Sequence, residues 1–386
     1  MPMTLRERVA AVAPRLRARA REAEELRCVP AESMKALAET GLFRAFTPKR
    51  YGGSELDLDV TYDALVTVAG ACTATGWVAS LMVIHHFLMA RFDPRAQDEV
   101  WGGGPDVLAA SGVAPSGEAV GVEGGMRVTG RWSYASGIDH CAWVILNTHV
   151  RDEAHPGMKP TSHFVLVPAA DYVIEDDWYV SGLRGSGSKS VRLDNVFVPD
   201  HRVETGLAIN AGKTEGLAVN SPLYQASFPG LFALTFAPPA IGTASAMVEH
   251  FREYMSTRKA AYTGAASRGK PTAWLRLAEA SANVDAARLV LDRDLVALQR
   301  EAASGAHVAA TTERARYDVA FIVDRCARAV DMLFAGSGGR ALYDSSPLQR
   351  CFRDMHSITQ HAATGIDDAG ERYGQFLIST PHQSTG

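Results

Sequence analysis

Residues 182–203 read GLRGSGSKSVRLDNVFVPDHRV, a glycine-rich turn followed by an apolar run that ends near a proline. Similar short runs, rich in Val, Trp and Tyr and separated by Gly, Pro and Asp, begin near Asp106. Runs of this kind predict strands. The segments are VLAASGV, GGMRVTGRWSYASG, AWVILNTHV, HFVLVPAA and YVIEDDWYV. We therefore expect a compact antiparallel sheet domain over residues 105–205.

The spacing of apolar residues is helical on both sides of this region. Before it, ESMKALAETGLF and DVTYDALVTVAG are expected to end at Gly41 and Gly70, and residues 1–27 read as a solvated amphipathic helix. After a polar loop at 204–216, long helical segments follow at 244–262, 274–303 and 311–335. Long helices with short connections favour a bundle. The prediction is an α+β chain with an N-terminal helical domain (1–104), the central sheet domain and a C-terminal four-helix-bundle domain (206–386).

Composition narrows the function classes. The 386 residues include 39 Lys and Arg against 43 Asp and Glu, with no sustained basic block after residue 27, so nucleic acid is not an expected partner. The cysteines are five in number and widely spaced, without a CxxC pair, which indicates neither a disulfide framework nor a structural zinc site. This usage fits a reducing compartment, and we expect the protein in the cytoplasm.

One uncharged stretch, residues 221–248, is long enough to cross a bilayer. Pro229, Pro238 and Pro239 interrupt it, and no second span follows. A helix that is apolar all round must be covered by something. We expect it to be buried in the protein core or at a subunit interface, with no membrane partner.

Two stretches resemble the acyl-CoA dehydrogenases: VPAESMKALAETGLFRAFTPKRYGG at 29–53 and the 182–203 segment quoted above. The order of helical domain, sheet domain and helical bundle is that superfamily's architecture. The dehydrogenases carry a catalytic glutamate in a loop that corresponds here to RCFRDMHSITQHAATGIDDAGERYG at 350–374, where His361 and Ala362 stand instead. Some members place the glutamate on an earlier helix, which leaves Glu249, Glu253 and Glu279 as candidates.

Three further places resemble the oxygenase components of two-component flavin-dependent monooxygenases: GWVASLMVIHH at 76–86, RWSYASGIDHCAW at 131–143, and LFAGSGGRAL at 333–342 with LQRCFRDMHSITQH at 348–361. The resemblance implies hydroxylation of a phenolic or polycyclic aromatic substrate through a flavin C4a-hydroperoxide. Its cofactors would be O2 and a reduced flavin, FMNH2 or FADH2, supplied by a separate NAD(P)H:flavin reductase. It also implies a homo-oligomer, expected to be a tetramer.

The alternatives are an N-oxygenase of an amine or amino sugar on the same fold, an acyl-CoA dehydrogenase, and a non-catalytic binding protein.

On the helix expected at 76–86, Trp77, Ser80, Ile84 and His85 lie within about one face. A single histidine on such a face is more often a core residue. The resemblance implies that His85 points at the substrate hydroxyl, with Trp77 and Phe87 closing the cavity. His86 lies on a different face and is expected to be structural.

In the other two places the resemblance also assigns roles. Ser136 would hydrogen-bond the flavin ring near N5, although a serine before a strand is also an ordinary turn residue. Trp132 would either stack at the edge of the ring system or pack the sheet. His361 would lie beside the reactive edge of the flavin, and it is the strongest single candidate.

The glycine-rich segment GSGGR at 336–340 lets backbone amides approach a phosphate, but it does not follow a strand and is no Rossmann fingerprint. In the superfamily this segment, here Gly336, Gly338 and Gly339, reaches the flavin of a neighbouring subunit. Arg184, Ser186 and Ser188 would contact the flavin phosphate or the substrate, while a tight turn explains their glycines equally well. His356 and His361 are five residues apart, so no metal site is expected.

Overall fold

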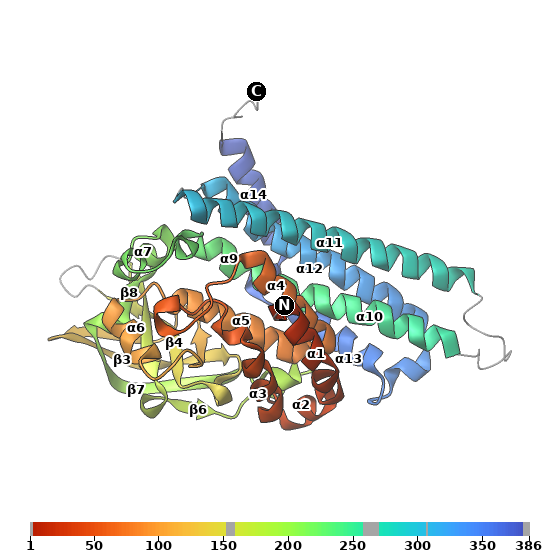
Figure 1. Ribbon diagram of the computed structural model, residues 1–386, viewed down its shortest axis with the longest axis horizontal. Coiled ribbons are helices and arrows are strands. Elements are labelled where there is room, and N and C mark those ends of the chain that lie inside the picture. Colours follow the sequence, from red (N-terminus) through yellow and green to blue (C-terminus); the bar gives the residue numbers. More distant parts are fainter. Residues whose placement is uncertain (1–2, 152–158, 258–269, 306–307, 381–386) are drawn as a thin grey trace.

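The computed structural model describes residues 3–151, 159–257, 270–305 and 308–380. Figure 1 shows a sheet at one end of the molecule and the long helices α10 (Ala237–Thr257), α11 (Pro271–Ser304) and α12 (Ala309–Ser337) at the other. Between them lie α4 (Leu58–Ala71) and α5 (Thr73–Met89), which both pack against α10. The predicted order of helical, sheet and helical regions is confirmed.

The N-terminal region is helical as expected. Helix α1 (Leu5–Ala18) begins with a capping box between Thr4 and Glu7, and α2 (Ala20–Leu26) and α3 (Ala31–Thr40) follow. Helix α3 ends at Gly41, whose φ of +80° suits glycine. The expected end of the next helix at Gly70 is wrong: α4 continues to Ala71 and is followed at once by α5, because Gly70 keeps helical geometry inside the last turn. Helix α6 (Pro94–Trp101) closes the region.

Eight strands of the described residues form one sheet in the order β6-β7-β3-β2-β4-β5-β8, with β1 beside β4. Their bounds are β1 Ala109–Gly112, β2 Glu118–Val122, β3 Gly125–Ala135, β4 Trp143–Val150, β5 Thr161–Pro168, β6 Val173–Glu175, β7 Lys189–Pro199 and β8 Val203–Thr205. The sheet is mixed rather than purely antiparallel, because β1 and β2 follow one another along the same edge of β4 and both run parallel to it. Alternation of apolar residues does not encode the direction of the neighbouring strand.

The segment expected to be a polar loop at 204–216 is mostly structured. It contains the end of β8, helix α7 (Gly206–Ala211) and the start of α8 (Glu215–Ala218). A buried arginine, Arg91, donates hydrogen bonds to the carbonyls of Ile209, Tyr224 and Ala226 at 2.6–2.8 Å. These contacts fold the segment 206–227 back onto the end of α5, so its short helices depend on tertiary structure.

The C-terminal helices match the long predicted segments, except that residues 258–262 lie outside the described residues. Helix α9 (Phe228–Leu234) precedes α10, and α13 (Pro347–Ile358) and α14 (Ile366–Ser379) follow α12. The stretch Phe228–Thr257 is long and apolar enough to cross a membrane, but 83% of its most apolar window is buried inside the protein. Pro229 and Pro238 stand in the first turns of α9 and α10, where a missing N–H costs little. The stretch therefore forms two helices, α9 and α10, that are mostly buried in the core, as predicted.

Candidate active site

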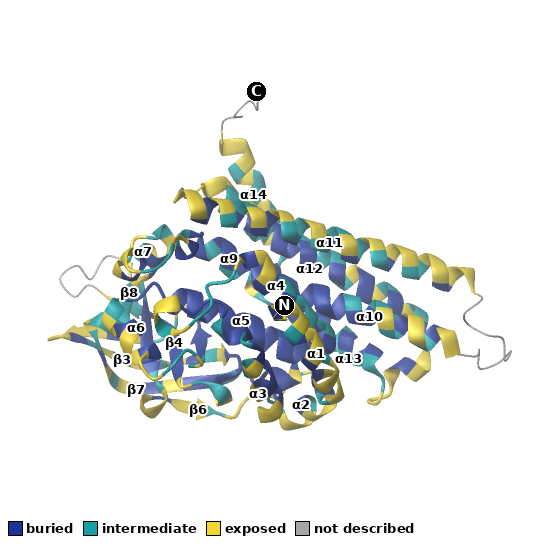
Figure 2. Ribbon diagram, viewed as in Figure 1, coloured by how far each residue is buried: buried dark blue, intermediate teal, exposed yellow. Residues whose placement is uncertain are grey.

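Helix α5 carries two of the predicted site residues, Trp77 and His85. All 17 of its residues are buried, and Figure 2 shows the helix dark blue along its length. It packs against β1, α4 and α10. Both side chains are therefore presented to the protein interior, where polar groups must find partners within the protein.

A chain of hydrogen bonds joins Trp77 to two serine segments. The indole N–H of Trp77 donates to Ser136 Oγ at 3.0 Å, and Ser188 Oγ lies 2.7 Å from the Oγ atoms of both Ser136 and Ser186. All four side chains are buried. Each hydroxyl has one hydrogen to donate and the three serines share two contacts, so one O–H stays free for another acceptor. The structure thus brings together four residues that the sequence placed in the site.

The backbone around Ser136 requires unusual conformations. Gly137 has a φ of +71°, and a Cβ there would lie 2.6 Å from Val78 and 2.7 Å from Met82 on α5, so only glycine fits. Tyr134 also has a positive φ, +67°, next to an irregularity in the β3–β7 ladder, and its side chain is 71% exposed. Left-handed conformations of bulky residues are rare and gather at functional sites. Sequence reasoning missed Tyr134, whose backbone conformation no residue pattern reveals.

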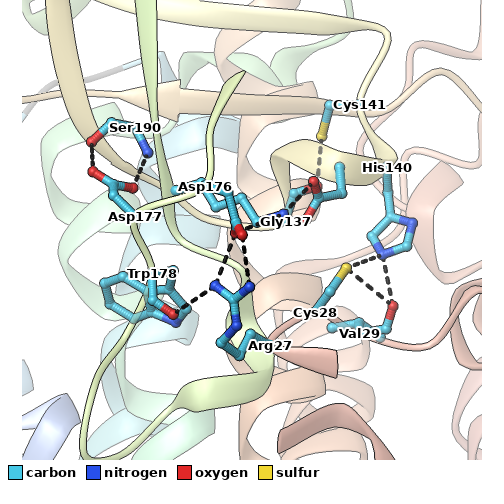
Figure 3. A network of polar contacts seen from close by, with 12 residues as sticks. Arg27, Cys28, Val29, Gly137, His140, Cys141, Asp176, Asp177, Trp178 and Ser190 are labelled. Atoms are coloured by element: carbon cyan, nitrogen blue, oxygen red, sulfur yellow. Dashed lines mark hydrogen bonds and ion pairs between the residues drawn. The ribbon is translucent and has the colours of Figure 1, made fainter. Parts of the chain in front are cut away.

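Figure 3 shows how this end of the sheet is held to the N-terminal helices. Arg27, at the end of α2, donates to both carboxylate oxygens of Asp176 at 2.9 and 2.7 Å. His140 Nε2 lies 2.8 Å from the carbonyl oxygen of Val29 and 3.3 Å from Cys28 Sγ. Burial raises the pKa of the Cys28 thiol to about 12, so this cysteine is no thiolate nucleophile. The contacts of Arg27 and His140 are therefore structural. They hold the segments that follow Ser136 and precede Ser186 against the end of α2.

His361 packs against the ring of Trp77. Its ring is 3.9 Å from the ring of Phe236 and 5.9 Å from that of Trp77, measured between centroids. Its Nδ1 accepts the N–H of Ala363 at 3.1 Å, so the proton of the neutral ring sits on Nε2, for which no described residue is a hydrogen-bond partner. Burial lowers the pKa of His361 to about 4, which keeps the ring neutral near pH 7. His361 therefore offers a neutral N–H beside an aromatic wall.

His85 is hydrogen-bonded at both ring nitrogens. Nδ1 lies 2.7 Å from the carbonyl oxygen of Ala109, which can only accept, so Nε2 is the acceptor for the Ser111 hydroxyl at 2.8 Å. Burial lowers the pKa of His85 to about 4. Ser111, on β1, was missed by the sequence reasoning, because pairing of β1 with the sheet alone brings it to α5. The adjacent His86 points elsewhere, with Nδ1 2.5 Å from Thr47 Oγ1.

Two predicted residues lie apart from this group. Trp132 is buried in the sheet core, and its indole N–H donates to the carbonyl of Asn147 at 2.6 Å. Phe87 is fully buried between Phe46 and Tyr224, at ring distances of 5.9 and 5.4 Å, so it does not join Trp77 in one wall. It is nearly three helical turns further along α5 and faces the 206–227 segment.

The residues predicted to meet a phosphate are only partly on the surface. Arg184 is exposed, although Ser186 and Ser188 beside it are buried. Gly336 belongs to the last turn of α12, and Gly338 and Gly339 are exposed in the connection to α13. This connection contacts α12 and α13, and Figure 1 draws it at the opposite end of the molecule from the sheet. One chain thus does not bring the glycine segment to the serine chain.

Comparison with known proteins decides the family. Residues 3–100 match the family described as acyl-CoA dehydrogenase, N-terminal domain, and residues 234–365 match acyl-CoA dehydrogenase, C-terminal domain. The flavin-dependent monooxygenase oxygenase subunit HsaA of Rhodococcus jostii (strain RHA1) is 38% identical, over 98% of this chain and 99% of that protein. The oxygenase component of p-hydroxyphenylacetate 3-hydroxylase of Acinetobacter baumannii is 36% identical, over 97% of this chain and 89% of that protein. The chain belongs to the flavin-dependent monooxygenases of the acyl-CoA dehydrogenase superfamily.

Solved structures of other proteins share the fold over nearly the whole chain. The crystal structure of 3-HSA hydroxylase from Rhodococcus sp. RHA1 matches with a TM-score of 0.93 at 36% identity, covering 98% of each chain. XiaF from Streptomyces sp., in complex with FADH2 and glycerol, matches with a TM-score of 0.89 at 30% identity, covering 97% of this chain and 95% of that chain.

This monooxygenase lacks a buried acid of the dehydrogenase type at the positions considered. Of the three candidate glutamates, Glu249 and Glu253 have side chains that are 52% and 70% exposed, and Glu279 is also exposed. A base that removes a proton from a bound acyl chain would have to reach into the interior. The residues that meet there are Trp77, Ser136 and His361 instead.

Proposed function

We propose that the protein is the oxygenase component of a two-component system that hydroxylates an aromatic substrate, using O2 and a reduced flavin made by a separate NAD(P)H:flavin reductase. The observation that carries this proposal is the junction of Trp77, Ser136 and His361, three residues far apart in the sequence that contact one another in series. Its relatives bear the names of such oxygenase components.

The donors at this junction fit a flavin ring. The serine chain has one O–H to spare, and Nε2 of His361 has its hydrogen available. We propose that Ser136 holds the ring near N5 and that His361 donates at its reactive edge. The bound flavin would supply the activation of O2. Around it, Trp77 and Phe236 would exclude water, which would otherwise release the oxygen as hydrogen peroxide.

The pair of His85 and Ser111 fits a phenolic hydroxyl. His85 Nε2 is an unprotonated acceptor, and the Ser111 hydroxyl on it can rotate to accept instead of donate. A substrate hydroxyl that donates to Nε2 would gain electron density in its ring, which suits attack on an electrophilic oxygen. We propose that His85 orients the substrate in this way, with Ser111 beside it.

Assembly and location belong to the same proposal. The exposed Arg184 and the exposed Gly338 and Gly339 would reach the phosphate portion of a flavin from two subunits, which makes the site depend on a homo-oligomer, expected to be a tetramer. The five cysteines are all free, which supports a cytoplasmic protein.

The first test mixes the oxygen-free protein and reduced FMN, or reduced FAD, with oxygenated buffer and follows the absorbance of oxidised flavin. Free reduced flavin reoxidises at once, whereas a protected site is expected to delay that absorbance. The same protein with a flavin reductase, NADH and a panel of phenols should yield hydroxylated product. Reoxidation at the rate of free flavin, with no product from any phenol, would refute the proposal.

A His361→Ala variant tests the role of the neutral N–H. Loss of one preorganised donor typically costs about 100-fold or more in the step it serves. We therefore expect hydrogen peroxide to rise strongly at the expense of product. An unchanged ratio of product to peroxide would remove His361 from the site.

A further inference from the structure

Helix α13 contacts the turn at residues 181–188, which contains Ser186 and Ser188 of the hydrogen-bonded serine chain. Arg353 Nη1 donates to the carbonyl of Ser181 at 2.6 Å, and Asp354 Oδ1 accepts the N–H of Leu183 at 2.7 Å. Between these two contacts, a Cβ on Gly182 would lie 2.1 Å from the carbonyl oxygen of Arg353. The backbone of the turn therefore touches the backbone of α13, and three consecutive residues are held by it.

Asp354 is an unusual residue to find at this place. It is 3% exposed, and burial raises the pKa of its carboxyl to about 6. The charged groups that act on it are Glu24 of α2 and the two arginines of its own helix, Arg350 and Arg353, yet Arg353 forms its ion pair with Glu24. A buried carboxylate without a close cation is costly unless it accepts hydrogen bonds. Its described hydrogen bond is the one to Leu183.

Leu183 needs that bond because its conformation is strained. Its φ is +51°, in the left-handed region that side chains other than glycine rarely adopt, and it is buried. It begins the short turn Arg184–Ser186, which ends at Gly187 with a φ of +53°. Strained residues persist where their surroundings fix them. Two side chains fix the peptide groups of Leu183: Asp354 accepts its N–H at 2.7 Å, and the indole of Trp178 donates to its carbonyl at 3.1 Å.

From Leu183, backbone hydrogen bonds lead to the site. The N–H of Ser186 donates to the carbonyl of Leu183 at 3.0 Å, and the N–H of Gly137 donates to the carbonyl of Ser186 at 2.9 Å. Gly137 follows Ser136 directly, and Ser186 also takes part in the hydroxyl chain. A shift at Leu183 would therefore be passed to both ends of the chain of hydroxyls.

Helix α13 also sets the place of His361. The helix ends at Ile358, and His361, three residues later, is held by the N–H that it donates to that residue's carbonyl at 3.2 Å. Helix α2 braces the turn as well, through the close approach of Gly185 to Ala23, but it does not lead to His361. One helix thus fixes both parts of the site.

We propose that Asp354 is a positioning residue that, through Leu183 and the turn 183–187, holds Ser136 at the separation from His361 that the oxygenation needs. The inference deepens the proposed function and rests on it. In this role Asp354 would act through Leu183, without contacting flavin or substrate, on the fraction of oxygen that is transferred to product rather than lost as peroxide.

The test compares Asp354→Ala and Asp354→Asn with the wild type. Asparagine keeps an oxygen that can accept from Leu183, whereas alanine leaves the buried N–H without an acceptor. The matched control is Asp331→Asn, because Asp331 also bonds α13, through His356 at 2.8 Å, but its side chain is 48% exposed and does not reach the turn. Hydrogen exchange is measured by mass spectrometry on peptides covering 131–137, 181–188 and 143–150, and the ratio of product to peroxide is measured with the reductase present.

We expect Asp354→Ala to exchange faster in 131–137 and 181–188 but not in 143–150, and to release roughly tenfold more peroxide per product. Asp354→Asn should recover most of both effects, and Asp331→Asn should match the wild type. Unchanged exchange in the two site peptides, or faster exchange spread equally to 143–150, would overturn the inference.

The two proposals fail separately. A wild type that reoxidises reduced flavin at the free rate and gives no product refutes the proposed function, while exchange in 181–188 still decides whether Asp354 holds the turn. If Asp354→Ala does not fold, the wild type and Asp354→Asn are compared at pH 7 and at a pH below the raised pKa of Asp354, where the wild-type carboxyl is protonated and accepts more weakly while the amide is unchanged. We expect exchange in 181–188 and peroxide release of the wild type to rise at the lower pH relative to Asp354→Asn, and equal changes in the two proteins would overturn the inference.

Discussion

The histidine next to Trp77 carries a consequence for stability. Its pKa falls to about 4 in the folded chain because it is buried, against about 6.5 for an ordinary histidine. Below about pH 6.5, His361 is protonated in the unfolded chain. In the folded chain it becomes protonated only near pH 4. The wild type should therefore lose stability relative to His361→Asn as the pH falls through this window, by about 1.4 kcal/mol per pH unit.

The free energy of unfolding of both proteins is measured by urea unfolding at several pH values between 7.5 and 4.5. Asparagine is a suitable replacement because it can still accept the N–H of Ala363 as a helix cap. The value at the highest pH sets the offset caused by lost ring packing. A difference that stays constant across the range would contradict a buried, neutral His361.

Among the elements, the segment 206–227 depends on one side chain. Arg91 is fully buried, burial lowers its pKa to about 9, and its two terminal nitrogens serve three carbonyls of this segment. Arg91→Met would leave those carbonyls without their donor. We expect a loss of about 3 kcal/mol in the free energy of unfolding and faster proteolysis within 206–227.

The matched control is Arg95→Met, because the Arg95 side chain is 70% exposed and pairs with Asp93 on the surface. It should change the free energy of unfolding by less than about 1 kcal/mol. Equal effects of the two substitutions, or cleavage sites unchanged by Arg91→Met, would show that the segment does not need the buried arginine.

The elements also show how far the sequence could be read. Helices α10, α11 and α12 could be predicted, because the helical spacing of apolar residues repeats over many turns in each. Strand β2, EAVGV, has too few residues to repeat a pattern. Helix α7 has six residues, and a buried arginine from another segment, Arg91, bonds its Ile209 carbonyl. In the site, resemblance pointed to Trp77, Ser136 and His361. Ser111 and Asp354 could not be found, because only strand pairing and helix packing bring them to their partners.

At the scale of the whole molecule, the proposed assembly makes a prediction. Leu342 and Tyr343 follow the glycine segment and are each 68% exposed, which is unusual for large apolar side chains next to one another. We expect light scattering to give a multiple of 41.4 kDa. Replacing both residues with Asp should lower that mass and weaken binding of reduced flavin together.

Leu207→Asp is the control, because Leu207 is 82% exposed on α7 and lies outside the proposed interface. It should leave the mass unchanged. The prediction is contradicted if the double variant keeps the wild-type mass. It is also contradicted if the variant dissociates into smaller species but still binds reduced flavin with full affinity, because the glycine segment would then not contribute to the flavin site of another subunit.

The run of three serine hydroxyls has a directional property. If each O–H points from Ser186 toward Ser136, Ser136 is a donor to its ligand; if all three rotate, Ser136 donates to Ser188 and keeps a lone pair for the ligand. The indole N–H of Trp77 supports either orientation, because it only donates. The same fixed oxygens can thus serve a ring nitrogen before and after it gains a proton, and the polarity of the pocket can reverse by bond rotations alone.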